Sequence, residues 1–262
     1  MRTLAPPGDH AELCRSAALV LPPGATISHR SAALLHGMPL PRRALPEQVE
    51  VSVFEPDRPP RMRGIVGHQL TPTGQRVVHV DGMRVLAPED AWVQLGVLLT
   101  PEELTVVGDY LVTGDEPYSG KAPPVDRAQL DGALRRHGRH RGVRALRLAA
   151  PRIRYGSLSP QETRLRLALE DARLPEPELN YRVAGPDGET AVMIDLAYPA
   201  YKVAIEYLGD HHRSTAAAYR KDISRREWLV ETGWDVIFVT ADDAFPDVAR
   251  RVRAALRRSL TK

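Results

Sequence analysis

The order of segments after residue 156 is the strongest constraint on the fold. Ser159 and Pro160 begin a helix, because serine caps helix N-termini and proline suits the first helical turn. Strand-like apolar runs follow at 180–183, 192–197, 202–207 and 234–240, and charged stretches with helical spacing lie at 216–232 and 243–260. The order helix, three strands, helix, strand, helix predicts an α/β domain over 156–262.

The residues before 114 alternate short helical and strand-like patterns. The segment Val49–Val53 alternates as a half-buried strand should, and Asp81-Gly82 is a hairpin signal between two further strand-like runs. We therefore expect a smaller α+β domain over 1–113. Residues 114–155 read as a proline- and glycine-containing linker and an arginine-rich helix or helix pair, broken near Gly138 and Gly142.

The composition excludes several protein classes. Hydrophobic residues make up 43% of the 262-residue chain and charged residues 26%, which is typical of a globular protein. A single cysteine, Cys14, excludes an internal disulfide and fits a reducing compartment, where it reads as a small buried hydrophobe. No run reaches the length of a membrane span and no secretory signal is visible, so we expect a cytoplasmic protein without a membrane partner.

Arginine dominates the stretch 135–154, which contains two histidines and no acid. Arg139 and Arg141 are candidate contacts to a polyanion, because each neutralised phosphate releases a counterion and the guanidinium matches phosphate geometry. A solvated helix face, or the amino-acid bias of a GC-rich genome, explains the same stretch equally well.

Two carboxylates interrupt apolar strands. Asp195 lies in VMIDL and Glu206 in VAIEY, and a short turn near Pro199 could bring the two strands together. Two close, desolvated carboxylates repel each other, and a divalent cation relieves that repulsion. Such a cation could polarise a phosphodiester and activate a water molecule. Alternatively, each acid faces solvent or pairs with an arginine.

Further polar residues flank these strands. On its own, a histidine pair such as His211 and His212 is surface, and charged helical residues form ion pairs with one another. Beside two strand carboxylates the same residues become candidates for proton transfer or for phosphate contact. The candidates are His211, His212, Arg213, Asp222, Arg225, Arg226 and, on the first helix of the domain, Glu162.

The stretch from Ser159 to Thr240 resembles a domain of unknown function related to very-short-patch-repair endonucleases, a branch of the PD-(D/E)XK nuclease superfamily. The matching motifs are SPQETRLR, PEPELNY, MIDLAYP, AIEYLGDHHR, YRKDISRREWL and TGWDVIFVT. The resemblance implies a restriction-endonuclease-like mixed sheet flanked by helices over 156–262. It implies a metal site at Asp195 and Glu206, which would take Mg²⁺ or Mn²⁺.

The same resemblance implies roles for the flanking residues. Glu162 would support the metal site and His212 would assist proton transfer, so that the catalytic set is Asp195, Glu206, His212 and Glu162. Asp222 and Arg226 match the polar pair on the following helix. With Arg225, His211 and Arg213 they are the candidate nucleic-acid contacts of this domain.

One position departs from the family pattern. The family reads Glu-Tyr-Asp-Gly where this chain has a leucine, Leu208, two residues after Glu206. Residues two apart on a strand share a face, so Leu208 takes a position next to the site but can neither bind a metal nor move a proton. Asp210 or Lys202 could substitute for the missing group.

The first part of the chain is similar to the region found in antitoxins of the AbiEi type. The similarity rests on ISHRSAALLHGMP, VDGMRVLAPEDAWVQLG and VVGDYLV. It implies a regulatory or nucleic-acid-binding module over 1–113, with Arg30, between His29 and Ser31, as a contact at a helix N-terminus. A plain helix cap with a solvent-exposed face is the alternative.

These observations leave three functions open. The first is a metal-dependent endonuclease acting on DNA, either duplex or nicked and mismatched, in repair or defence. The second is a catalytically degenerate nuclease fold that binds DNA as a regulator of toxin–antitoxin type. In the third, the acids are structural and the arginines reflect genome bias.

Overall fold

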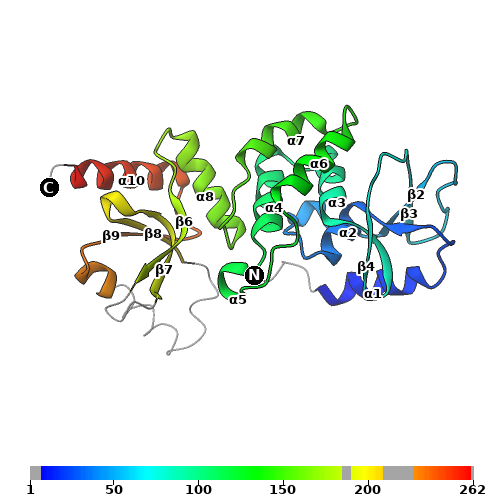
Figure 1. The fold of residues 1–262 in the computed structure, drawn as a ribbon, viewed down its shortest axis with the longest axis horizontal. Coiled ribbons are helices and arrows are strands. Elements are labelled where there is room, and N and C mark those ends of the chain that lie inside the picture. The colour runs from blue at the N-terminus through cyan, green and yellow to red at the C-terminus, as the bar shows by residue number, and fades with distance from the viewer. Residues whose placement is uncertain (1–6, 185–189, 209–226, 261–262) are drawn as a thin grey trace. The chain divides into compact units, whose positions relative to one another are not determined.

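The computed structural model describes residues 7–184, 190–208 and 227–260. Contacts divide the chain into two compact units, Met1–Tyr155 and Gly156–Lys262. Each unit combines a mixed sheet with helices, which confirms the predicted α/β fold class (Figure 1). None of the helices in the described ranges has both the length and the apolar character that crossing a membrane requires.

The first unit is built on a five-stranded sheet with the order β3-β2-β1-β5-β4. Strand β1 pairs antiparallel with β2 and parallel with β5, β3 runs parallel to β2, and β4 and β5 form an antiparallel hairpin. Asp81 and Gly82 turn this hairpin with positive φ angles of 49° and 79°, as the sequence predicts. The strands are β1 (Thr26–Ile27), β2 (Val49–Phe54), β3 (Ile65–Leu70), β4 (Val77–Val80) and β5 (Met83–Leu86).

Helices pack against this sheet and against one another. Thr100 and Glu103 form a reciprocal capping box at the start of α4, where Pro101 occupies the first helical position. The helices are α1 (Pro7–Ala18), α2 (His29–Leu35), α3 (Pro88–Gln94), α4 (Pro101–Thr113), α5 (Glu116–Ser119), α6 (Arg127–His137) and α7 (Val143–Ala149). Short 3-10 helices lie at Arg42–Ala44, Leu95–Val97 and Ala150–Arg152.

The segment 114–155, expected to be a linker with a basic helix, forms part of the first unit. Helices α6 and α7 are the predicted pair broken at Gly138 and Gly142. Their apolar residues Leu130, Ala133 and Leu146 are buried in the same core as Val51 and Trp92. Because these side chains are removed from water only against the rest of the unit, the two helices belong to that core and do not connect two separate domains.

The second unit has a four-stranded sheet with the order β6-β7-β8-β9. The first two pairings are antiparallel and the last, between β8 and β9, is parallel. Its elements are α8 (Pro160–Asp171), β6 (Glu178–Ala184), β7 (Thr190–Tyr198), a 3-10 turn at Pro199–Tyr201, β8 (Val203–Tyr207), β9 (Asp235–Val239) and α10 (Phe245–Ser259), and residues 227–231 are also helical. All four strands lie where the apolar runs predict them.

Two apolar clusters hold the second unit together. In one, Leu165 of α8 and Val252 of α10 are buried with Ile205 of β8. In the other, Ala204 of β8 is buried with Trp234. Successive strand residues point to opposite faces, so the alternation of Ala204 and Ile205 separates the two clusters and places Glu206 on the Ala204 side.

Candidate active site

The pairing of β7 with β8 brings the two predicted strand acids together. Leu196 and Ile205 are the last pair in the antiparallel register of β7 and β8, and Asp195 and Glu206 are the next residues of the two strands beyond that pair. Glu206 is buried, with only 6% of its surface exposed. Oδ2 of Asp195 accepts a hydrogen bond of 2.8 Å from the backbone N–H of Tyr207.

Strand β6 adds an asparagine to this row. The pairs on either side, Leu179 with Leu196 and Tyr181 with Ile194, place Asn180 beside Asp195. Asn180 takes a φ of 46°, a left-handed conformation that asparagine adopts more readily than most residues. Its buried Nδ2 donates hydrogen bonds to the carbonyl oxygen of Gly156 and to Oε2 of Glu162.

Helix α8 supplies the third acid. Ser159 caps the helix by accepting a hydrogen bond from the backbone N–H of Glu162, which fixes that residue in the first turn. Oε2 of Glu162 accepts hydrogen bonds from the backbone N–H of Leu158, at 2.8 Å, and from Asn180 Nδ2, at 3.4 Å. Burial, and next the charge of Asp195, raise the pKa of Glu162 to about 7.

Glu162 of α8 and Asp195 of β7 interact with each other, and together with Glu206 of the neighbouring strand β8 they make up the candidate carboxylate cluster. Their oxygen atoms suit a hard divalent cation, and the raised pKa of Glu162 reflects a repulsion that a cation would relieve. Within the described ranges no three histidine, cysteine or acidic side chains are placed together to hold a metal ion. A Mg²⁺ site needs fewer protein ligands, because this ion keeps several waters and binds through one or two carboxylates.

Leu208 continues the backbone of β8 past Glu206. Its N–H donates a 2.7 Å hydrogen bond to the carbonyl oxygen of Val239, so the residue is tied to the sheet. Lys202, a candidate substitute for the missing polar group, lies before β8, at the other end of the strand from Leu208. Its Nζ donates a hydrogen bond to the carbonyl oxygen of Thr232, which keeps it away from the cluster.

Several predicted site residues lie outside the described residues. They are the substitute candidate Asp210, the catalytic candidate His212, and the candidate nucleic-acid contacts His211, Arg213, Asp222, Arg225 and Arg226.

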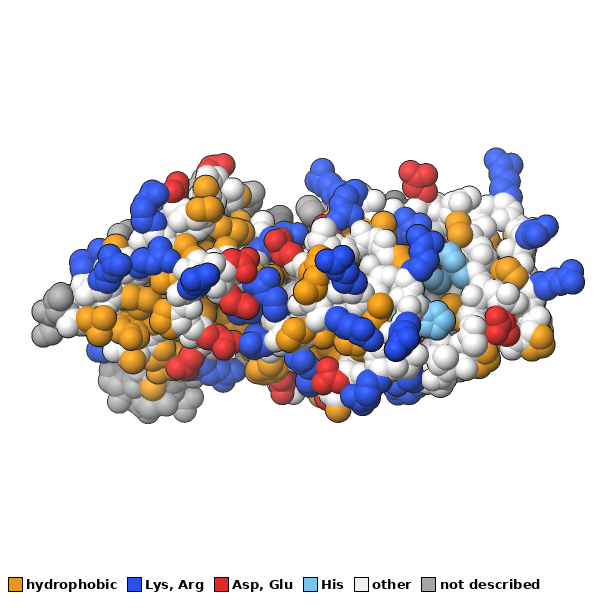
Figure 2. Space-filling model, turned by 90° about the horizontal axis from the view of Figure 1, so that it is seen from above, with side chains coloured by type: hydrophobic (Ala, Val, Ile, Leu, Met, Phe, Trp, Pro, Cys, Tyr) orange, Lys and Arg blue, Asp and Glu red, His pale blue; other side chains and the backbone are white. Residues whose placement is uncertain are grey.

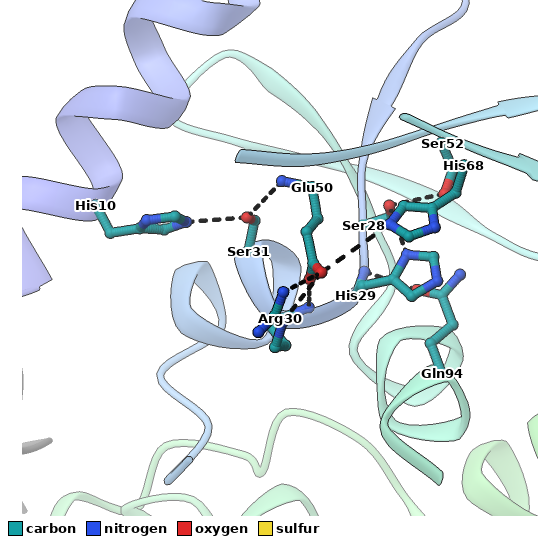
Figure 3. A network of polar contacts seen from close by, with 9 residues as sticks. All are labelled: His10, Ser28, His29, Arg30, Ser31, Glu50, Ser52, His68 and Gln94. Carbon is teal, nitrogen blue, oxygen red and sulfur yellow. Dashed lines mark hydrogen bonds and ion pairs between the residues drawn. The ribbon is translucent and has the colours of Figure 1, made fainter. Parts of the chain in front are cut away.

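In the first unit, Arg30 is committed to a buried carboxylate. The backbone N–H, Nε and Nη2 of Arg30 all donate to the carboxylate of Glu50, at 2.7, 3.0 and 2.6 Å (Figure 3). Burial alone would raise the pKa of Glu50, but the hydrogen bonds and charge of Arg30 hold that pKa below its ordinary value. Arg30 was predicted to contact nucleic acid, and in this arrangement its guanidinium neutralises Glu50 instead.

Arg139 and Arg141 lie in the turn between α6 and α7, and both side chains are exposed. Their exposure leaves them accessible to a polyanion, and the contact itself stays a prediction. The residue that sequence reasoning missed is Asn180, because a single asparagine at the start of a strand-like run carries no chemical signal until the register shows its neighbours.

Comparison with known proteins gives relatives without a stated activity. Two proteins of Mycobacterium tuberculosis, the uncharacterized proteins MT2308 (strain CDC 1551 / Oshkosh) and Rv2248 (strain ATCC 25618 / H37Rv), are each 30% identical to this chain over 189 residues. The match covers 70% of this chain and 65% of each relative. No protein-family model matches the chain. No solved structure matches it either.

Proposed function

We propose that the second unit is a divalent-metal-dependent endonuclease of PD-(D/E)XK type that hydrolyses phosphodiester bonds in DNA. The observation that carries the proposal is the carboxylate cluster: burial and the charge of Asp195 raise the pKa of Glu162, and Glu206 lies on the strand next to that of Asp195. Glu162 and Glu206 are both buried, and a bound cation would stabilise their charged forms. The ordered resemblance of 159–240 to nuclease-related domains supports the same assignment.

Asp195 and Glu206 would hold Mg²⁺ or Mn²⁺, with Glu162 in support. Once bound, the cation supplies charge that polarises the phosphodiester and lowers the pKa of the attacking water. The chain contributes orientation: the Tyr207 N–H fixes one oxygen of Asp195, and Asn180 fixes one oxygen of Glu162. With a pKa of about 7, Glu162 can hold or release a proton near neutral pH.

The second candidate is a nuclease fold that has lost catalysis and binds DNA as a regulator. Leu208 favours it, because a hydrocarbon side chain stands where the family has a polar group. The exposed Arg139 and Arg141 of the first unit suit either candidate, since both require contacts to phosphate. DNA binding alone therefore cannot separate the two candidates, whereas metal-dependent cleavage can.

The decisive experiment is nicking of supercoiled plasmid in Mg²⁺ or Mn²⁺ by the full chain and three variants. Asp195→Asn and Glu206→Gln remove charge from the cluster while keeping side-chain shape. Glu178→Gln is the matched control, because Glu178 is an exposed acid on β6. We expect the first two variants to lose nicking by a factor of about 100 or more and the control to retain it.

A folded protein that leaves the plasmid intact with both metals would contradict the nuclease proposal. If Leu208→Asp then confers metal-dependent nicking, the unit is a decayed nuclease and the DNA-binding alternative takes its place. If nicking persists in Asp195→Asn and Glu206→Gln at the level of Glu178→Gln, the cleavage does not come from this cluster.

A further inference from the structure

A cavity of about 490 Å³ lies entirely within the first unit. Its walls come from the end of β3 and the loop after it, from α3 with the following 3-10 turn, and from the end of α6. This volume is in the range of sites that hold small ligands. The cavity uses none of the second unit's carboxylates, so its occupant is a question separate from the nuclease proposal.

One wall of the cavity is cationic. It contains Arg136, His137, His140 and Arg141, and the single acid among the lining residues is Asp90. Nη2 of Arg136 donates a 2.7 Å hydrogen bond to Oδ1 of Asp90, so that pair is neutral. Arginine and histidine side chains stand side by side on the face in Figure 2.

The charge of this wall is available to a ligand. The side chains of His140 and Arg141 make no hydrogen bond or ion pair within the part of the chain that the structure describes, and both are exposed. Since Asp90 is already neutralised, Arg141 leaves the wall with a net positive charge that suits an anion.

A second wall of the cavity is planar and uncharged. The rings of His29 and His68 stack with their centroids 3.8 Å apart and their planes inclined by 25° (Figure 3). Burial, and next the neighbouring His68, lower the pKa of His29 to about 3, so the ring is neutral at physiological pH. The side-chain oxygen of Gln94 accepts a 2.7 Å hydrogen bond from the backbone N–H of His29, and a 2.9 Å hydrogen bond between Nδ1 of His29 and Oγ of Ser28 holds the ring in place.

The rest of the lining suits a flat heterocycle. Val93, Val97 and Ala133 provide apolar surface, while Gln69, Thr71 and Thr73 provide amide and hydroxyl groups. Apolar surface with a few polar groups is the usual composition of a site that orients a planar ligand. Imidazole rings are among the side chains on which nucleic-acid bases stack.

We propose that this cavity binds a nucleotide, with its base against the imidazoles and the apolar surface and its phosphate at His140 and Arg141. An inorganic anion would use the cationic wall alone, and an apolar ligand would leave the arginine unused. A nucleotide uses both walls. It can arrive as a free mononucleotide or as the end of a nucleic-acid strand, because the two share this chemistry.

The test is calorimetric titration of the full chain in EDTA, so that the result does not depend on the metal site. The probes are deoxyadenosine 5′-monophosphate, deoxyribose 5-phosphate, inorganic phosphate and a 5′-phosphorylated tetradeoxyadenylate. Arg141→Ala removes the cation that lines the cavity. Arg144→Ala is its matched control, since Arg144 is an exposed arginine three residues away that does not line the cavity.

We expect the mononucleotide to bind about tenfold or more weakly to Arg141→Ala, because a charge-assisted contact is lost, and to bind Arg144→Ala as it binds the wild type. Deoxyribose 5-phosphate should bind about tenfold more weakly than the mononucleotide, because stacking of the base is lost. Tighter binding of the oligonucleotide, with the same dependence on Arg141, identifies a strand end as the source, and equal binding identifies a free nucleotide.

Three results would overturn the proposal. The mononucleotide does not bind, or it binds no better than inorganic phosphate. In the third, Arg144→Ala weakens binding as much as Arg141→Ala, which would mean diffuse attraction to a basic surface.

Discussion

Burial and, next, the charge of Asp195 of β7 raise the pKa of Glu162 of α8, although the whole of β6 separates these two elements in the sequence. Glu162 is 7% exposed, so water screens its interaction with Asp195 only weakly. The surrounding fold therefore holds the two carboxylates close together although they repel each other. The free-energy cost of this repulsion depends on pH and on bound cations.

The first prediction concerns stability against pH. The folded chain keeps the Glu162 proton until about pH 7, whereas the unfolded chain releases it near 4.5. Folding binds a proton between these values, so the contribution of Glu162 to the free energy of unfolding falls as pH rises from 4.5 to 7. Between pH 5 and pH 8 the wild type should lose about 2–3 kcal/mol of unfolding free energy through Glu162, and Glu162→Gln should not show this loss. Unfolding in urea at the two pH values measures the difference between variant and wild type. An equal difference at the two pH values would contradict it.

A second prediction concerns the cation itself. Mg²⁺ should raise the melting temperature of the full chain, and its apparent affinity should increase about tenfold from pH 6 to pH 8, because Glu162 must release its proton on binding. Asp195→Asn should abolish the shift, and Glu178→Gln should leave it intact. Thermal melts at increasing Mg²⁺ concentration measure this directly, and a shift that is independent of pH would exclude Glu162 from the site.

The strands of the second unit could be predicted from the sequence because each is a short apolar run with clear ends. The same pattern could not show that β9 pairs parallel with β8, nor that Asn180 stands beside Asp195. Register depends on contacts between segments that are distant in sequence, and a local pattern does not contain them. The carboxylate cluster was thus predictable in its members, but not in the coupling of Glu162 to Asp195.

In the first unit, the predicted elements were correct and their grouping was not. Glycine, proline and arginine in 114–155 resemble a linker, yet Leu130 and Leu146 are buried in the core of the first unit. Helices α6 and α7 are short and one face of each is strongly basic. Few apolar residues are therefore left to show the helical spacing in the sequence. The ion pair of Arg30 could not be predicted for a related reason, since the sequence does not show that the carboxylate of Glu50 lies against it.

A third prediction concerns acid sensitivity of the first unit. His29 stays neutral in the fold down to about pH 3, whereas in the unfolded chain it is protonated below 6.5. The free energy of unfolding therefore falls as pH drops below 6.5. At pH 5 the contribution of His29 to this loss is about 2 kcal/mol. Glu50 opposes this shift, while His68 and Arg30 reinforce it.

His29→Asn should reduce this acid sensitivity, because asparagine does not titrate and tolerates the φ of 50° that this position requires. Unfolding in urea at pH 7 and pH 5 measures the effect. His79→Asn, at an exposed histidine of β4, is the control. If both variants keep the pH dependence of the wild type, the buried His29 is not its source.

The last prediction tests whether α7 is held to the first unit as tightly as its packing indicates. Gly142 precedes α7 with a φ of 85°, and a Cβ there would lie 2.3 Å from the backbone carbon of Gly96. Gly142→Ala should therefore destabilise the unit by about 2–4 kcal/mol, from the left-handed backbone and from the forced separation of α7. Gly120 has a similar φ of 69° with nothing within 4 Å, so Gly120→Ala should cost only about 1 kcal/mol. Chemical unfolding of the two variants measures the difference, and equal costs would mean that the chain around α7 moves freely enough to absorb the methyl group.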